Sequence, residues 1–495
     1  MTEAKTASLA PSAKNADGPS VRLQGKNPWL NAWKIALGVG ILGVGISIGA
    51  GAMGGEHSAL HERFAFSYLF AFQVTLSIAL GSVFFILIQH LSSAGWSVTV
   101  RRTAEFLASG LVVMAVLFIP VWLCKGTLYP WWNAENAPAE HHASNEVVGT
   151  TTLTSHQTHG DDQVKEPEHG EHAGQGEHAG HHGDHAEGAV KHDHATGHDP
   201  NDEALEAEEH HLLAKKRWWL NHDFFNGRAV LYFLVWAFLG WTLYKRSVDQ
   251  DKAKDFKTTN FLKAFSTIGT ILFALSLTFA GVDWIMSLQP MWFSTIFGVY
   301  LFAGSFVAAL ATIILVTLGL RKSGVLLKEI TVEHYHDLGK LMFGFNVFWA
   351  YIAFSQMMLI WYAGLPEETP FYHIRWFTDE VHHKASGWQT VSLALLGLHF
   401  AAPFVFLISR NIKRRLQLLG VGAALILTMH IVDIYWLIFP NLRERFEVSL
   451  LWLDIAALIG VASLYFAFVL HRMTKNALIP IGDPRLARAL TFENA

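Results

Sequence analysis

Eight ionisable side chains lie inside long apolar stretches of the sequence, and they are the first candidates for chemistry. A charge in the hydrocarbon layer of a membrane is costly, so such groups tend to mark a proton path or a binding site. Their positions predict two proton half-channels, one reaching each membrane surface, whereas the alternative is that some of the carboxylates only stabilise helix ends. The outer group is Asp283, His430, Asp433 and Asp454, and the inner group is Glu105, Lys263, Lys340 and His399.

Quinol binding is a second chemistry that these residues allow. A quinol site needs an apolar slot with a base and a hydrogen-bond partner near the ring oxygens. His430 and Asp433 are three residues apart and therefore share a helical face. Candidate walls of the slot are Trp284, Tyr435 and Trp436. Aromatic side chains near a membrane surface also form an ordinary interfacial belt, which is the alternative for these three residues.

We expect the chain to bind no redox cofactor or metal of its own. The single cysteine, Cys124, excludes a cysteine-held iron-sulfur cluster and a CxxCH haem site. Two b haems would need two deep histidines on each of two helices, but only His399 and His430 lie deep in the apolar stretches. The segment HYHDLGK (334–340) resembles a metal cluster, and the polar first turn of a helix is the other interpretation.

The elements that position these residues are predicted to be membrane helices. The chain is 51% hydrophobic and only 16% charged, whereas soluble chains average about 25% charged residues. A hydrocarbon core about 30 Å thick needs about 20 apolar helical residues. We therefore predict an all-α integral membrane protein with about ten transmembrane helices. The predicted runs are 32–54, 65–90, 103–124, 228–245, 261–288, 292–320, 340–364, 386–408, 415–439 and 449–471.

The composition changes abruptly between the third and fourth runs. Residues 135–211 contain 15 of the 27 His and 18 of the 41 acidic residues, but only two Lys, so their formal charge is −16. The rest of the chain has 35 basic and 23 acidic residues, a charge of +12. Because this segment has almost no large apolar residues to offset chain entropy, we predict a disordered loop. Loose binding of zinc, nickel or copper by its imidazoles is the alternative.

Lys and Arg are distributed unequally between the two sets of connections. The short loops on one side contain only Arg63, Arg375, Lys384, Arg443 and Arg445. The other side contains many more, and the positive-inside rule makes it cytoplasmic. We predict two cytoplasmic tails and a periplasmic His-rich loop. The predicted parts are a tail at 1–31, helices 1–3 at 32–132, the loop at 133–215, helices 4–10 at 216–472 and a tail at 473–495.

The segment DWIMSLQPMWFSTIFG (283–298) contains a predicted turn between the fifth and sixth helices. Pro290 stands between two apolar spans and would end one helix before the next begins. Asp283 lies about two turns before this break and needs a partner. The candidates are Gln356 and Tyr362, or Asp433 through a water molecule.

Four runs of the sequence together resemble the ActF subunits of bacterial alternative complex III. They are FSYLFAFQVTLSIALGSVFFILIQHLSSAGWSVTVRRTAE (66–105), FAGVDWIMSLQPMWFSTIFGVYLFAG (279–304), YHDLGKLMFGFNVFWAYIAFSQMMLIWYAGLPEETPFY (335–372), and LHFAAPFVFLISRNIKR with MHIVDIYWLIFP (398–414 and 429–440). The membrane subunits of that family are similar to NrfD and polysulfide-reductase anchors. The resemblance covers most of the predicted membrane body.

The resemblance implies two four-helix bundles plus extra helices in a bacterial inner-membrane respiratory complex. The complex would oxidise quinol and reduce cytochrome c or another periplasmic acceptor. Its implied partners are an NrfD-like sister subunit, iron-sulfur and multihaem cytochrome c subunits, and the lipid bilayer, with a terminal oxidase as a further candidate. Quinol oxidation would occur in the sister subunit, so quinone belongs to the complex and not to this chain. No nucleic-acid binding is expected.

Two other classes of function remain open on the sequence. A secondary transporter would also bury carboxylates within ten helices, although Pro120, Pro290 and Pro403 do not fall at corresponding places of an internal repeat. A purely structural membrane anchor, without any proton role, is the second alternative. Co-purification separates these classes, because a transporter should isolate alone and a subunit should arrive with its haem-bearing partners.

Overall fold

The computed structural model describes residues 21–53, 55, 58–134, 212–379, 384–442 and 448–493, which belong to one compact unit. Nearly all of the predicted loop at 133–215 lies outside the described residues, as do residues 1–20 of the first tail. The disorder predicted for the loop therefore stays a prediction, and loose metal binding by its imidazoles stays the alternative.

Ten helical segments are long and apolar enough to cross a membrane, which confirms the predicted all-α membrane fold. Six are continuous: α1 (Trp29–Met53), α2 (Ala59–Leu91), α9 (His222–Ala253), α11 (Phe297–Lys322), α12 (Val332–Ala363) and α18 (Leu451–Lys475). The other four contain a break or a 3-10 extension: α3 (Val98–Ser109) with α4 (Leu111–Leu117) and α5 (Ile119–Leu123); α10 (Phe256–Trp284) with η3 (Met286–Leu288); α14 (Gly387–Ala394), η4 (Leu395–Ala401) and α15 (Ala402–Leu407); and α17 (Leu416–Ile438) with η5 (Phe439–Asn441).

The remaining elements are short and lie between these spans or, for α19, after the last one. They are α6 (Lys125–Leu128), α7 (Pro130–Ala134), α13 (Pro370–Trp376), α16 (Arg410–Arg414), η6 (Val448–Leu450), α19 (Leu486–Leu490), and a two-stranded antiparallel ladder of β1 (Phe377–Asp379) and β2 (Lys384–Ala385). This ladder is the only departure from helix among the described elements.

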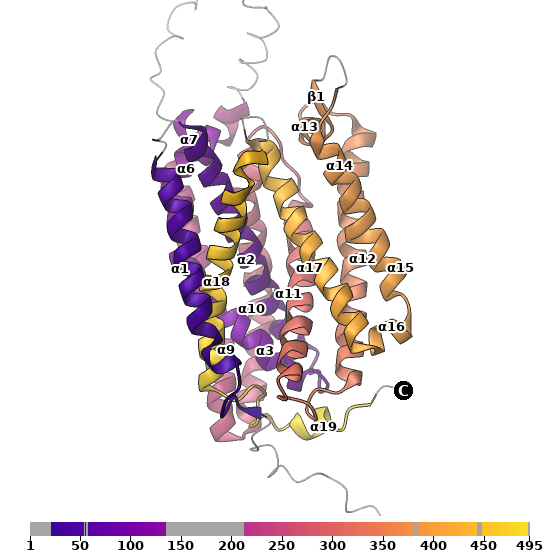
Figure 1. Cartoon of the computed structure of the whole chain (residues 1–495). Coiled ribbons are helices and arrows are strands. Elements are labelled where there is room, and N and C mark those ends of the chain that lie inside the picture. The colour runs from indigo at the N-terminus through magenta and orange to yellow at the C-terminus, as the bar shows by residue number, and fades with distance from the viewer. Residues whose placement is uncertain are drawn as a thin grey trace, which may run out of the picture. The chain divides into compact units, whose positions relative to one another are not determined.

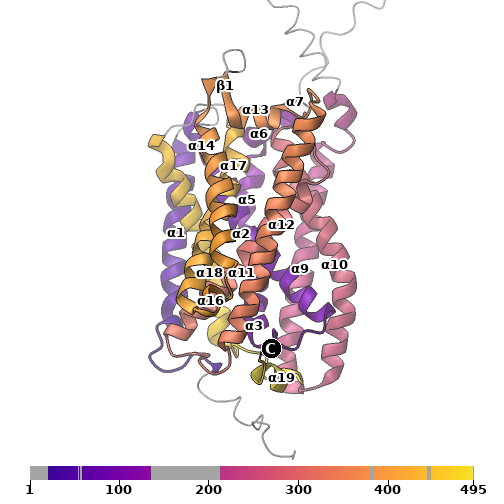
Figure 2. The ribbon, with the colours of Figure 1, turned by 90° about the vertical axis from the view of Figure 1, so that its right-hand side faces the viewer.

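The spans form two four-helix bundles with two additional helices. In the first bundle, α2, α3–α5, α9 and α10 pack in a ring, and in the second bundle α11, α12, α14–α15 and α17 do the same. The seam between the bundles is formed mainly by α2, together with α10, against α11, while α1 packs on α18 and α18 on α2. Figures 1 and 2 show the long helices side by side and roughly parallel.

Glycines allow the closest of these helix contacts. A Cβ added to Gly81 of α2 would lie 2.1 Å from the backbone oxygen of Ser305 on α11, so a side chain here would push the two bundles apart. Gly43 of α1 and Gly460 of α18 face each other in the same manner. Small residues permit close backbone approach between membrane helices, where van der Waals packing supplies much of the association energy.

Two ends of the helical unit are named here for the argument that follows. The tail end holds α16, α19 and Val21, whose carbonyl accepts a hydrogen bond from the N–H of Leu478 at 2.9 Å (Figure 1). The hairpin end holds α6, α7, α13 and the β1–β2 ladder (Figures 1 and 2). The two described terminal segments thus lie at one end, and the side of the membrane that they face stays a prediction.

Three helices begin about two turns before the residues predicted from hydropathy. The α2 helix begins at Ala59, α9 at His222 and α12 at Val332, where residues 65, 228 and 340 were expected. Arg63 and Arg228 therefore belong to the first turns of long helices. The prediction was wrong for α2 and α9 because both guanidinium groups are neutralised by carboxylates of other helices, which hydropathy along one helix does not reveal.

Candidate functional site

The eight predicted proton-path residues occupy three different settings. The four residues of the predicted outer group lie in the half of the spans nearer the hairpin end. Three of the four residues of the predicted inner group lie in the half nearer the tail end. Three carboxylates are held in buried ion pairs, namely Asp283, Asp454 and Glu105. The two lysines, Lys263 and Lys340, are exposed. The remaining three residues gather in the second bundle and are His399, His430 and Asp433.

Asp283 is the acceptor of a complete set of hydrogen bonds at the hairpin end of the first bundle. The Nε and Nη2 atoms of Arg228 donate to its two oxygens at 2.8 and 2.9 Å. The indole N–H of Trp219 donates at 2.8 Å, and the hydroxyl of Tyr232 at 2.7 Å. All of these donors come from α9 or from the segment just before it. A bidentate pair of this kind fixes the α9–α10 contact.

The predicted partners of Asp283 are therefore wrong. Gln356 accepts a hydrogen bond from Ser294 at 3.2 Å, and the side chain of Tyr362 is 86% exposed. Asp433 lies in the second bundle with its own donors. The sequence could not show which helix faces Asp283, because helix pairing is decided by packing between segments.

Asp454, in the first turn of α18, is the second carboxylate that pairs with a buried arginine. Arg63 of α2 forms an ion pair with it through Nη2 and donates from Nε at 3.0 Å. The hydroxyl of Tyr435 donates to Asp454 at 2.8 Å and also accepts from Arg63 at 3.0 Å. The pair thus ties α18, α2 and α17 together at the hairpin end. Arg63 is only 1% exposed, although the sequence placed it in a short outer loop.

Glu105 belongs to a charge network at the tail end. Arg101 and Arg102 hold its two oxygens at 3.0 and 2.9 Å, and they reach in opposite directions to Asp483 at 2.8 Å and to Asp251 at 2.9 Å. All but one of these five side chains are fully buried, and Asp251 is nearly so.

The network docks the C-terminal segment against the bundle. Arg485 also pairs with Asp483 at 2.9 Å, and the N–H of Gly482 donates to Asp251 at 3.3 Å. Burial raises the pKa of Asp483, but the charges of Arg101 and Arg485 outweigh burial and hold that pKa well below its usual 3.8. Asp483 is therefore ionised throughout the physiological range. We call this network of Glu105, Arg101, Arg102, Asp251, Asp483 and Arg485 the tail clasp, because it holds the C-terminal segment against the bundle.

The two lysines lie on the outside of the helical unit. Lys263 is exposed on α10. Lys340 is 49% exposed and forms an ion pair with Asp337, three residues earlier on α12. Neither side chain faces the interior where the other candidates gather.

Asp433 is the carboxylate of the second bundle, and its surroundings differ from those of the other three. The hydroxyl of Tyr300 on α11 donates to Oδ1, and the indole N–H of Trp349 on α12 donates to Oδ2 at 3.2 Å. Asp433 is 1% exposed, and no cation forms an ion pair with it among the described residues. A buried carboxylate surrounded by neutral donors can take up and release a proton without breaking an ion pair.

His430 lies one turn before Asp433 on the same helix. Its Nε2 is 2.8 Å from the hydroxyl of Ser77 on α2, and its Nδ1 has no hydrogen-bond partner among the described residues. The ring packs against Gly304 of α11, where an added Cβ would lie 3.1 Å from the ring. His430 thus connects the second bundle to the seam with α2.

His399 is buried in a π-helical turn between α14 and α15. Pro403 has no N–H to donate to the carbonyl of His399, and the amide of Asn346 on α12 donates to it at 3.0 Å. Neither ring nitrogen has a hydrogen-bond partner among the described residues. The ring centroid lies 3.8 Å from that of Trp349, which is the donor to Asp433. Single π turns often occur at functional sites.

Above this cluster, Arg375 of α13 closes the hairpin end of the second bundle. Its guanidinium donates to the carbonyls of Phe371, Trp436 and Leu437, so the cation meets the carboxyl end of α17. Burial lowers the pKa of Arg375 to about 9, which leaves it charged at neutral pH. Burial also raises the pKa of the neighbouring Tyr372 to about 12. The pair forms a polar cover between the cluster and the surface.

The three aromatic candidates for a quinone site do not share one slot. Trp284 packs in the first bundle against Phe118, at 4.7 Å between ring centroids. Tyr435 bonds to Asp454, while the indole N–H of Trp436 donates to Ser392 at 2.8 Å. Tyr435 and Trp436 therefore point to different neighbours, and Trp284 lies in another bundle.

The segment HYHDLGK forms the beginning of α12. Nδ1 of His334 accepts from the N–H of Thr331 at 3.2 Å, which completes a capping box at the helix start. Asp337 pairs with Lys340. In the described part of the chain, no group of three or more His, Cys, Asp or Glu side chains is placed to hold a metal ion. The polar first turn accounts for the pattern in this segment.

Several partners in these sites were missed from the sequence. Tyr300, Trp349 and Asn346 look like ordinary polar or aromatic residues of apolar helices, so nothing in their spacing marks them. Arg63 and Arg228 did carry a signal, because an arginine within one or two turns of an apolar run can belong to the helix and face its interior.

Taken together, the second bundle gathers Asp433, His430 and His399, with Tyr300 and Trp349 as hydrogen-bond donors to Asp433 and with Trp349 packed against His399. The first bundle and its flanking helices hold charges in neutral pairs that stabilise packing. No family model matches this chain, and no curated protein matches it.

Proposed function

We propose that this chain is an integral membrane subunit of a respiratory quinol:cytochrome c, or other periplasmic acceptor, oxidoreductase of the alternative complex III type. The proposal comes from the four runs that resemble ActF subunits, and the two four-helix bundles with extra helices agree with it. The chain would hold no redox cofactor. It would pack against the quinol-oxidising sister subunit and would contribute a proton path.

The proposed membrane is the bacterial inner membrane. The tail end would be cytoplasmic, because its connections carry most of the Lys and Arg, and the hairpin end and the His-rich segment would be periplasmic. A cysteine introduced in place of exposed Arg410 should then react with a membrane-impermeant thiol reagent only in inverted vesicles.

The observation that supports a proton role is the environment of Asp433. Its carboxylate has two neutral donors, and His399 is joined to it through the ring of Trp349. His430 lies on the same helical face, and its Nδ1 has no hydrogen-bond partner in the part of the chain that the structure describes. We place proton exchange on Asp433, with His399 on the tail side and Tyr300 on the side of Arg375. The paired carboxylates Asp283, Asp454 and Glu105 would be structural in this arrangement.

The test is the proton-to-electron ratio of the purified complex in sealed vesicles. Asp433→Asn and His399→Ala should lower the number of protons moved per quinol oxidised, while electron transfer to the acceptor continues in the sister subunits. Lys340→Ala is the matched control, because Lys340 is exposed and lies away from the cluster. An unchanged ratio in both buried variants would remove the proton role and leave a membrane anchor.

Co-purification tests the complex itself. Affinity purification of the whole chain from native membranes should bring iron-sulfur and multihaem cytochrome c subunits with it. A chain that isolates alone and moves a solute or protons without electron transfer would be a secondary transporter, and the proposal would then be wrong.

A further inference from the structure

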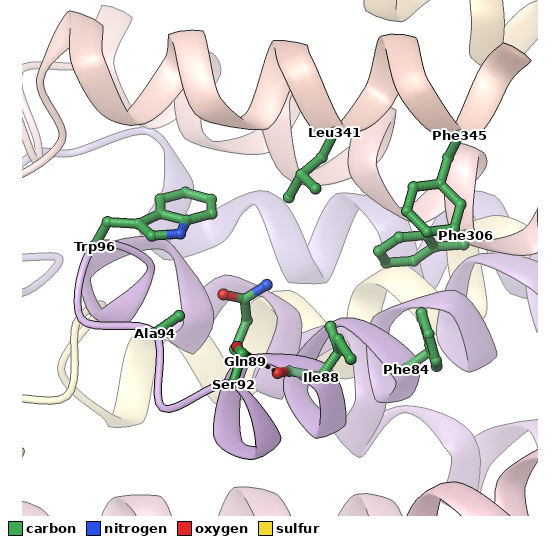
Figure 3. A pocket seen from close by; sticks show the side chains of 9 residues that line it. All are labelled: Phe84, Ile88, Gln89, Ser92, Ala94, Trp96, Phe306, Leu341 and Phe345. Atoms are coloured by element: carbon green, nitrogen blue, oxygen red, sulfur yellow. Dashed lines mark hydrogen bonds between the residues drawn. The ribbon is translucent and has the colours of Figure 1, made fainter. Parts of the chain in front are cut away.

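A cavity of about 300 Å³ lies near the tail end at the seam between the two bundles (Figure 3). Its walls come from α2, from the turn at residues 92–97 that follows α2, and from α11 and α12. None of its lining residues belongs to the Asp433 cluster or to the buried ion pairs. Ser92 is exposed, so the cavity is not closed on that side.

The inner wall is aromatic and the lining carries no charge. Phe306 meets Phe84 at 4.8 Å and Phe345 at 4.4 Å between ring centroids, in both cases edge to face. Trp96 lies at the other end of the cavity (Figure 3). Such walls favour a flat apolar ring, which can pack on aromatic faces and edges. Without a cationic side chain in the lining, the cavity offers nothing to neutralise a phosphate group.

One polar group inside the cavity lacks a partner. Gln89 of α2 is 5% exposed, and its Oε1 has no hydrogen-bond partner among the described residues. Figure 3 shows its amide reaching into the space between Trp96 and Leu341. The hydroxyl of Ser92 already donates to the carbonyl of Ile88 at 2.7 Å. A ligand that donates a hydrogen bond to Oε1 would remove the cost of an unsatisfied buried acceptor.

The backbone beneath Gln89 is held by the turn that ends α2. The N–H of Ala94 donates to the carbonyl of Gln89 at 3.1 Å, and the N–H of Ser93 donates to the carbonyl of His90 at 3.1 Å. Ser93 has a φ of 51°, the left-handed conformation expected at this position of a Schellman motif. The amide is thus presented from a fixed helix end, which limits the entropy lost when a ligand binds.

We propose that this cavity binds a lipid-soluble phenol. The ring would occupy the space between Trp96 and Phe306, its hydroxyl would donate to Oε1 of Gln89, and its alkyl tail would leave toward the exposed side at Ser92. Binding needs no electron transfer, so this inference is independent of the function proposed above. A hydrocarbon chain would fill the same volume but would leave the Gln89 oxygen without a donor.

The experiment compares two photoreactive probes on the whole protein in lipid nanodiscs. One probe is 4-hexylphenol with a diazirine on its tail, and the other is its methyl ether, which cannot donate a hydrogen bond. Mass spectrometry of the digested protein would locate the adducts. We expect the phenol to label the peptide around residues 84–96 about tenfold more than the ether, the factor lost with one hydrogen bond to a buried acceptor.

Variants then test the role of Gln89. Gln89→Leu should reduce labelling by the phenol to the level of the ether, and Gln89→Met is a second variant of similar length in case the first does not fold. Gln73→Leu is the matched control, because Gln73 is a buried glutamine of the same helix outside the cavity. Its labelling should equal that of the unaltered protein.

Three results would overturn the inference. Equal labelling by phenol and ether would show a groove for any hydrocarbon. Undiminished labelling in folded Gln89→Leu and Gln89→Met protein would show that the amide does not bind the hydroxyl. Absence of adducts in this peptide of the unaltered protein would show that no phenol binds here. None of these results bears on the proton-to-electron ratio.

Discussion

The two four-helix bundles treat buried charge in opposite ways. In the first bundle and its flanking helix, each buried carboxylate faces an arginine: Asp283 faces Arg228, and Asp454 faces Arg63. In the second bundle, Asp433 has only neutral donors among the described residues, and Arg375 donates its hydrogen bonds to backbone carbonyls.

This difference separates charges that hold the fold from charges that can change. Removing one partner of a buried pair leaves an isolated charge in an apolar interior, so the fold needs both charges of the pair. A carboxylate that has only neutral donors leaves no such charge behind when it takes up a proton. The contrast therefore supports our proposal that proton exchange takes place in the second bundle, with the first bundle as a scaffold.

The largest effect is expected when Arg228 loses its charge. Arg228→Met would leave Asp283 buried without a cation, at a cost of about 3–5 kcal/mol. Thermal unfolding of the purified protein would measure this loss. The double variant Arg228→Met with Asp283→Leu should recover much of it, because an apolar pair needs no neutralisation. If the Arg228→Met protein were as stable as the unaltered protein, the proposed difference between the two bundles would be wrong.

The tail clasp offers the next largest effect and a dependence on pH. Asp483→Asn should cost about 3 kcal/mol, since Arg101 and Arg485 lose a buried partner. The folded pKa of Asp483 lies below its unfolded value, so its contribution is present above the unfolded pKa and is lost as pH falls through the folded pKa.

Limited proteolysis of residues 476–493 would measure docking of this segment. Cleavage should be constant from about pH 5 to 8 and should increase below about pH 4. The Asp483→Asn protein should be cleaved readily at every pH. Protection that stays unchanged in the variant would show that apolar contacts, and not the clasp, hold the segment.

A smaller effect on stability is expected at Asp433. In Asp433→Asn the amide oxygen can accept one hydrogen bond, and the hydroxyl of Tyr300 can rotate to accept from the amide group. The loss should be about 1 kcal/mol, because no cation is left unpaired. The same unfolding measurement on Asp283→Asn provides the contrast. Equal losses of stability in the two variants would mean that the fold depends on the charge of Asp433 as much as on that of Asp283.

The smallest effect is expected at Lys340, whose side chain is 49% exposed in its ion pair with Asp337. Solvent screens the charge of Lys340, so Lys340→Ala should change the free energy of unfolding by less than about 0.5 kcal/mol. Unfolding in low and high salt would check this. A loss comparable with that of Arg228→Met would contradict the distinction between buried and exposed charge.

The candidate site was predictable in part. Asp433 and His430 were found from their cost in an apolar run, and their spacing of three residues placed them on one face. Tyr300 and Trp349 were not found, because their side chains are common in membrane helices and only the neighbouring helix gives them a role. Lys263 and Lys340 were predicted from depth along a helix, but depth does not reveal the direction in which a side chain points.

The sequence by itself determined the class of this protein, its ten spans and the depth of most of the ionisable groups. These properties follow from local composition and from the fixed rise of a helix. Only the tertiary structure decided that Arg228 neutralises Asp283, that Arg63 neutralises Asp454, and that Asp433 has no such partner among the described residues. Each of these outcomes depends on helix packing between residues distant in the chain, which hydropathy along one segment does not encode.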